Sequence, residues 1–139
     1  MSEPNPHTLA AVAREVAATL GDARAALEAG AERPGDAESL ARVADLLGQA
    51  RGALEVVGVH GGAMLAREAR EVAGVLAAQA GTRAPASAAL EALMRAVVQL
   101  PAYAERVLGG GRDLPIVLLP LLNDLRAVRG VALLSEGTV

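Results

Sequence analysis

The sequence contains no cysteine, phenylalanine, tryptophan or lysine, and Tyr103 is its one aromatic residue. Without cysteine, the chain has no disulfides, no thiolate catalysis and none of the commoner zinc sites. Hydrophobic residues still make up 53% of the chain, so its core must consist of Leu, Val, Ala and Met. These residues suit helix-on-helix packing better than a sheet, which favours β-branched and aromatic residues.

The chain also lacks a concentration of charge of one sign. Acidic and basic residues are mixed along it, the net charge is −3, and there is no basic stripe to neutralise a nucleic acid backbone. The N-terminus is polar, unlike a signal peptide. The most hydrophobic run, Leu114 to Leu122, is interrupted by two prolines, whereas a membrane span needs about 20 apolar residues. We therefore expect a cytoplasmic protein that has no membrane span and does not bind nucleic acid.

A chain of 139 residues is long enough for one domain with its own core. Apolar residues spaced three and four apart predict five helices. Capping and helix-breaking residues set the expected boundaries. The five helices should run from Asn5 and Pro6 to Gly30, from Asp36 to a turn at Gly58–Gly62, from that turn to Gly81, from Ser87 to Gly109, and from Asp113 as cap to a stop at Gly130.

The fold class predicted is all-α: an antiparallel four-helix bundle with an extra, proline-bent helix at the C-terminus. Pro101 is expected to kink the fourth helix, and Pro120 to bend the fifth near its middle. The bundle should occupy residues 1–130, and residues 131–139 should form a frayed tail.

No residues for catalysis are recognisable. The two histidines, His7 and His60, are expected near helix ends and cannot form a local metal cluster. Ser39 and Ser87 are interpreted as capping or first-turn residues. The glycines at 58–62 follow no strand and lack the phosphate-binding loop pattern. We therefore expect no enzyme activity, no metal and no cofactor.

Two glycines one turn apart, Gly48 and Gly52, lie inside the second predicted helix, where each costs roughly 1 kcal/mol relative to alanine. Two explanations remain open: close approach of a neighbouring helix, or close approach of another protein. Arg51 and Glu55 on the same helix form an i,i+4 pair, as do Arg67 and Glu71 on the next, and such pairs give weak helix support.

The segment Gly48-Gln49-Ala50-Arg51-Gly52 resembles the HxxKG motif of histidine-phosphotransfer domains. In that family a histidine on the exposed flank of a four-helix bundle relays phosphate between receiver domains. The lysine stabilises the phosphate, and the glycine leaves room for the receiver. Position by position, Arg51 matches the lysine, Gly52 matches the glycine, and Gly48 stands at the histidine. The resemblance thus implies a phosphotransfer-like bundle whose phosphoacceptor is missing.

A longer resemblance covers the C-terminal half. Leu100-Pro101-Ala102-Tyr103 and residues 111–130 are similar to a segment of FimL-type scaffold proteins and of the N-terminal region of ChpA-type hybrid chemosensory kinases. The first helix, at Ala25-Ala-Leu-Glu28, extends the likeness. These proteins act in the type IV pilus chemosensory pathway that governs twitching motility and cyclic-AMP signalling. The resemblance implies a domain that acts through protein contacts.

The function expected from the resemblance is a pseudo-phosphotransfer scaffold that binds a receiver domain or a polar signalling scaffold. The residues expected to bind that partner are Gly48, Arg51, Gly52 and Glu55 on the second helix and Asn123, Asp124, Arg126 and Arg129 on the last. One alternative is an active phosphotransfer domain that uses another acceptor, such as His60. Another is a homodimer whose seam is the run from Leu114 to Leu122.

Overall fold

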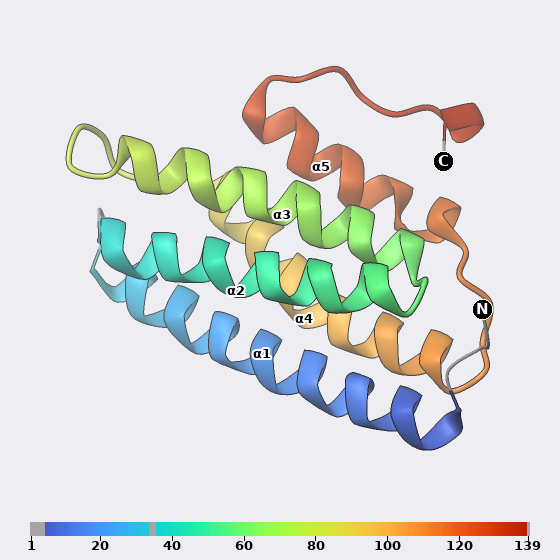
Figure 1. Cartoon of the computed structure of the whole chain (residues 1–139). Coiled ribbons are helices and arrows are strands. Elements are labelled where there is room, and N and C mark those ends of the chain that lie inside the picture. Colours follow the sequence, from blue (N-terminus) through green and yellow to red (C-terminus); the bar gives the residue numbers. More distant parts are fainter. Residues whose placement is uncertain (1–4, 34–35, 139) are drawn as a thin grey trace.

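The computed structural model describes residues 5–33 and 36–138, and every regular element in them is helical. Figure 1 shows five α-helices: α1 (Pro6–Glu32), α2 (Ala37–Val56), α3 (His60–Gln79), α4 (Ser87–Leu108) and α5 (Leu119–Arg129). Two short 3-10 helices, η1 (Pro115–Leu118) and η2 (Glu136–Thr138), precede and follow α5. The all-helical prediction, with four main helices and a fifth at the C-terminus, is confirmed.

Two predicted side-chain caps begin helices as expected. The Asn5 carboxamide oxygen accepts a hydrogen bond from the Thr8 amide at 2.9 Å, and proline follows Asn5 at the first helical position. Asp36 accepts from the Ser39 hydroxyl at 2.8 Å and from the Ser39 amide at 3.3 Å. These hydrogen bonds, the one from the hydroxyl first, lower the pKa of the Asp36 carboxyl below its usual value.

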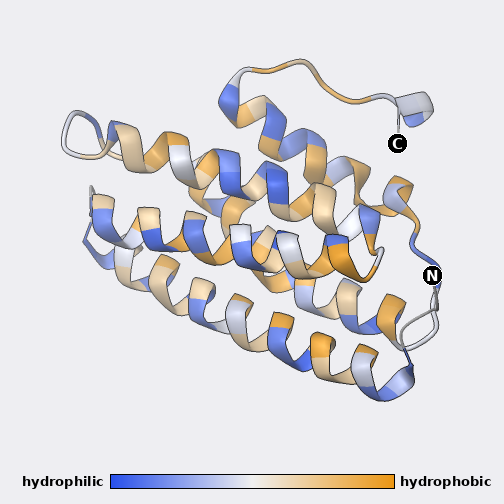
Figure 2. Cartoon of the chain, in the orientation of Figure 1, coloured by the Kyte–Doolittle hydropathy of each residue, from blue (hydrophilic) through white to orange (hydrophobic). Residues whose placement is uncertain are grey.

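The first four helices run alternately up and down and form a ring, in which α1 packs on α2 and α4, and α3 packs on the same two helices (Figure 1). Helix α5 forms an additional layer on α3 and α4. Figure 2 shows hydrophobic and hydrophilic residues alternating along the helices, as amphipathic packing requires. Leucines dominate the core, and the fully buried ones include Leu20, Leu27, Leu47, Leu54, Leu65, Leu93, Leu100, Leu122 and Leu125.

Two helix ends differ from the predicted boundaries. Helix α1 continues past Gly30 to Glu32, and Gly30 is buried against α2, where an added Cβ would lie 3.2 Å from the Ser39 Cβ. The turn between α2 and α3 consists of residues 57–59, so Gly61 and Gly62 lie in the first turn of α3 rather than before it. Gly58, with a φ of 78°, supplies the left-handed residue of this turn.

The prediction that Pro120 bends the last helix is wrong. Residues 115–118 form η1, so α5 begins only at Leu119 and Pro120 is its second residue. Proline is tolerated in the first turn because the amide it lacks would have no intrahelical partner there. Helix α4, in contrast, continues through Pro101 to Leu108.

The segment after α5 makes hydrogen bonds back to that helix. Gly130, with a φ of 74°, ends α5 and turns the chain back. The Asn123 side chain then accepts from the Leu134 amide at 2.7 Å and donates to the Leu134 carbonyl at 2.9 Å. Arg126 Nε donates to the Ala132 carbonyl at 2.6 Å. Residues 131–134 therefore follow α5 as an ordered return strap.

None of the helices that the described residues form is both long and apolar enough to cross a membrane.

Candidate functional site

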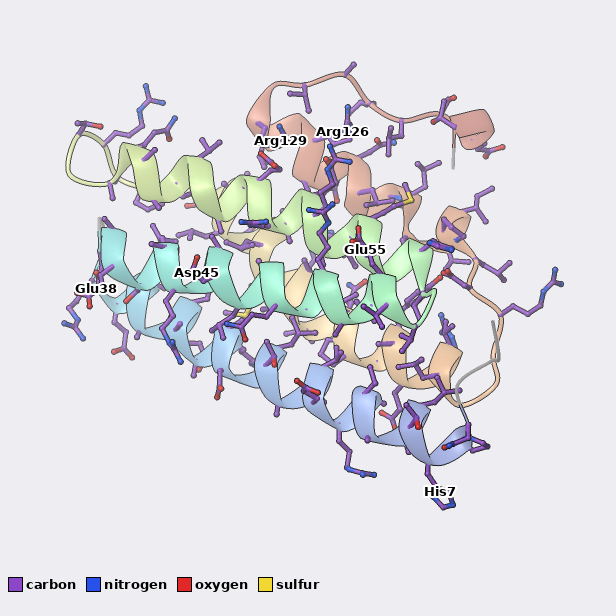
Figure 3. The ribbon with its side chains drawn as sticks, in the orientation of Figure 1. His7, Glu38, Asp45, Glu55, Arg126 and Arg129 are labelled. Carbon is purple, nitrogen blue, oxygen red and sulfur yellow. The ribbon has the colours of Figure 1, made fainter. Side chains whose placement is uncertain are left out.

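Four residues that the sequence singled out, Gly48, Arg51, Gly52 and Glu55, share one side of α2, which we call the α2 flank. Their spacing of three and four residues places them on neighbouring turns. Arg51 Nε donates to Glu55 Oε1 at 3.1 Å, so the predicted i,i+4 pair is present. Figure 3 labels Glu55 on this helix. Gly52 and Glu55 are exposed, and Gly48 and Arg51 are half-buried.

Helix α3 contributes a side chain to the α2 flank that sequence reasoning missed. A Cβ added at Gly48 would lie 3.2 Å from Arg70 Cζ and 3.3 Å from its Nε, so the Arg70 guanidinium lies across the bare backbone of Gly48. A side chain at Gly48 would require this guanidinium to shift by a few tenths of an ångström. Nothing in the sequence near Gly48 indicates Arg70, because the contact depends on how α2 and α3 face each other.

Gly52 behaves differently from Gly48. A Cβ added at Gly52 would meet nothing within 4 Å. Close approach of a neighbouring helix was one of the two explanations for Gly48 and Gly52. It does not account for Gly52. The open space above Gly52 leaves the explanation of an approaching protein in place.

The predicted binding residues on α5 contact other parts of the same chain. Arg126 Nη1 donates to both carboxylate oxygens of Glu68 at 3.1 Å, and Arg129 Nη2 donates to them at 3.0 and 3.4 Å. Figure 3 shows the two arginines side by side on α5, above α3. Glu68 is buried in α3, so this cluster, which we call the Glu68 clamp, fastens α5 to the bundle.

The other two predicted binding residues on α5, Asp124 and Asn123, also have partners within the chain. Asp124 Oδ2 accepts from Arg95 Nη2 of α4 at 2.9 Å, and Asn123 binds the return strap. The pair expected between Arg67 and Glu71 does not form among the described residues, whose five ion pairs lie elsewhere. The structure thus gives every predicted α5 binding residue an intramolecular partner.

Asp113 does not cap the last helix, contrary to the prediction. Its carboxylate accepts from the Gly61 amide at 3.1 and 3.0 Å and from the Tyr103 hydroxyl. The first amides of a helix lack intrahelical partners, and Val59 at the start of α3 has no side-chain acceptor. Asp113 supplies the missing acceptor from the linker between α4 and η1. Gly61 permits this contact, since a Cβ there would lie 2.5 Å from Asp113 Oδ1.

The one aromatic residue is part of the same contact. The Tyr103 ring is buried. Burial first, and then the hydrogen bond to Asp113 and its charge, raise the pKa of the Tyr103 phenol well above its usual value. His60, which precedes Gly61 and is the first residue of α3, is exposed. Its side chain makes no hydrogen bond to the described residues.

Within residues 5–33 and 36–138, no three His, Asp or Glu side chains lie close enough together to hold a metal ion. The α2 flank combines an exposed glycine with the cations of Arg51 and Arg70. An arrangement of this kind can admit the close approach of another backbone and attract carboxylates on it.

Comparison with known proteins relates the helical bundle to one protein family. The FimL C-terminal domain family matches residues 6–119, which is α1 through the first residue of α5. Scaffold protein FimL of Pseudomonas aeruginosa is 30% identical over 130 residues, which cover 94% of this chain and 23% of that protein. The chain therefore spans less than a quarter of that relative's length. No solved structure matches it. Since the family match covers most of the helical bundle, the chain belongs to the FimL C-terminal domain family.

Proposed function

We propose that this chain is a non-catalytic pseudo-phosphotransfer domain that binds a protein partner in type IV pilus chemosensory signalling, and that the α2 flank is its partner-binding surface. Membership of the FimL C-terminal domain family and the name of the scaffold relative support a binding role. The four-helix ring is consistent with the phosphotransfer-like architecture that the sequence resembles.

The observation that carries the proposal is the contact between Gly48 and Arg70. At the position that corresponds to the phosphoacceptor, the chain has no side chain, and a guanidinium from α3 lies in the space above it. A phosphoryl group has no nucleophile to attach to here. The same surface presents a cation to an incoming partner, and an acidic patch on that partner would complement it.

The first experiment is a binding screen against the receiver domains and polar scaffold proteins of the pathway, with the immobilised domain as bait. The wild-type domain should bind at least one of them, and Arg70→Glu should weaken that affinity by about tenfold or more. Arg83→Glu is the matched control, because Arg83 is exposed in the linker between α3 and α4. Absence of any partner, or equal loss in both variants, would contradict the proposal.

Exposed His60 at the start of α3 favours a second candidate, an active phosphotransfer domain with a displaced acceptor. An exposed imidazole at a helix N-terminus is accessible to a phosphodonor. Incubation with a cognate kinase and labelled ATP should then give an acid-labile phosphate that His60→Ala loses and His7→Ala retains. An unlabelled wild-type protein would exclude this candidate.

A further inference from the structure

A second surface lies on a different face of the bundle from the α2 flank. The C-terminal half of α4 and the linker that leads into η1 enclose a groove with a volume of about 690 Å³. Ala102 and Arg106 line it from α4, and Arg112, Leu114 and Val117 line it from the linker and η1. None of these residues belongs to the α2 flank or to the Glu68 clamp.

Hydrophobic side chains are unusually exposed along one wall of this groove. Among the residues that line it, Leu114 is 40% exposed and Val117 is 53% exposed. Single exposed hydrophobic residues are common on protein surfaces, whereas a cluster of them marks an interaction site. The 3-10 geometry of η1 contributes to this exposure, because a short 3-10 helix cannot turn every apolar side chain of the run towards the core.

Both charged residues that line the groove are arginines, although the whole chain carries a net charge of −3. Its charged lining residues are Arg106 and Arg112, and no carboxylate among the described residues forms an ion pair with either. The Arg106 guanidinium lies 5.3 Å from the centre of the Tyr103 ring, a cation–π contact that holds it at the wall. Two unpaired cations beside an apolar strip complement an acidic, amphipathic partner.

The shape of the surrounding layer indicates a helical partner. Helix α4 is 22 residues long and α5 is 11, which correspond to about 33 Å and 16 Å. The ion pair between Arg95 and Asp124 shows that α5 crosses the N-terminal half of α4. Among the described residues, the layer that α5 forms on α4 is continued beside the C-terminal half of α4 only by the linker and short η1. An additional helix bound in the groove would extend this layer.

We propose that this groove binds an amphipathic helix of a partner protein, with apolar residues at helical spacing and Asp or Glu at the edges of that apolar face. The proposal shares with the proposed function only the premise that the chain is an interaction domain. It assigns a second docking surface, so that the bundle can hold two partners at once.

A display selection tests the chemistry directly. Helical peptides of about 16 residues, randomised without aromatic residues, are selected for binding to the wild-type domain. The selected sequences should carry Leu, Ile or Val three and four residues apart, with Asp or Glu flanking them. Because Tyr103 is the one aromatic residue of the chain and lines the groove, binding of a selected peptide should change its fluorescence.

Matched variants locate the binding site. Val117→Asp and Arg112→Glu should each weaken the best peptide by about tenfold or more. Val75→Asp and Arg83→Glu, exposed positions on α3 and in the following linker, should leave its affinity within about twofold. Circular dichroism of each variant verifies that the bundle is folded, and Arg112→Glu remains informative if Val117→Asp does not fold.

Four results would overturn the proposal: no selected binder, selected peptides without an acidic bias, full affinity in both groove variants, or a wild-type dimer in sedimentation experiments that Val117→Asp abolishes. The last result would show that a second copy of the chain closes the groove. Failure here is separable from failure of the proposed function, because Arg70→Glu reports on the α2 flank and the groove variants do not.

Discussion

The α2 flank and the Glu68 clamp both consist of arginines and carboxylates, but they bond over very different distances along the chain. On α2, Arg51 pairs with Glu55, four residues away, and both side chains are substantially exposed. In the clamp, the two α5 arginines reach Glu68 from 58 and 61 residues away, and its carboxylate is buried. The pair on α2 joins two residues of the same helix, whereas the Glu68 clamp fixes α5 to α3.

Similar residues therefore contribute differently to stability at the two places. A local, exposed pair contributes little stability because solvent screens it and both side chains lose freedom. A buried carboxylate that loses its cations is costly, since it cannot be solvated again. The contrast supports our proposal that the α2 flank binds a partner, whereas the Glu68 clamp docks α5 on the bundle.

Removal of the two carboxylates should separate these roles most clearly. Glu68→Ala leaves two partly buried arginines without their carboxylate and should lower the free energy of unfolding by about 3 kcal/mol. Glu55→Ala, on the α2 flank, should change it by about 0.5 kcal/mol or less. Urea unfolding followed by circular dichroism measures both, and similar losses in the two variants would remove the distinction.

Gly61→Ala should give the second-largest effect. The added methyl would lie 2.5 Å from Asp113 Oδ1, 2.8 Å from the Tyr103 hydroxyl and 3.3 Å from the Pro115 Cα. Because backbone is among these contacts, the linker must shift and the cap of α3 is disturbed. We expect a loss of about 2 kcal/mol in thermal or urea unfolding. Unchanged stability would show that the linker is loosely held and that the Asp113 cap contributes little.

Titration of Tyr103 tests the same long-range contact through pH. Its phenol pKa is raised in the folded protein by burial and by Asp113, whereas an unfolded tyrosine titrates near pH 10. The neutral Tyr103 phenol therefore makes its full contribution to the stability of the folded protein below pH 10. As pH rises above 10, this contribution is lost by up to about 1.4 kcal/mol per pH unit, until the pKa of Tyr103 in the folded protein is reached.

Tyrosinate absorbance measures this directly, since no other aromatic residue interferes. Folded protein should show no titration near pH 10, and protein in urea should show it there. Asp113→Asn, which removes the charge, should move the folded titration to lower pH. A folded phenol that titrates near pH 10 would contradict the buried contact.

The sequence was sufficient for features that depend on neighbouring residues. Apolar spacing predicted all five helices and the bundle. The two caps at Asn5 and Asp36 were predicted because a capping oxygen and its amide lie three residues apart. On the α2 flank, the sequence indicated Gly48, Arg51, Gly52 and Glu55, which lie on one helix, but it did not indicate Arg70 of α3.

Contacts between distant segments could not be predicted in the same way. Asp113 was assigned to the nearest following helix, but its partner amide is 52 residues earlier, at a helix end that only the tertiary fold brings close. Glu68 did give a signal, because its spacing from Leu65 and Val72 places it at the inner face of α3. That signal predicts a buried partner without identifying the arginines of α5.

The smallest expected effect concerns Gly52 and bears most directly on function. An added methyl there meets nothing within 4 Å, so Gly52→Ala should raise the free energy of unfolding by about 0.5–1 kcal/mol through helix propensity alone. The same methyl would stand in the path of a partner that approaches the α2 flank closely. If the variant is more stable but binds the partner from the screen more weakly, the glycine is retained for recognition at the expense of stability. If it is more stable and binds equally well, the partner does not contact this turn of α2, and the binding surface must be sought around Arg70 alone.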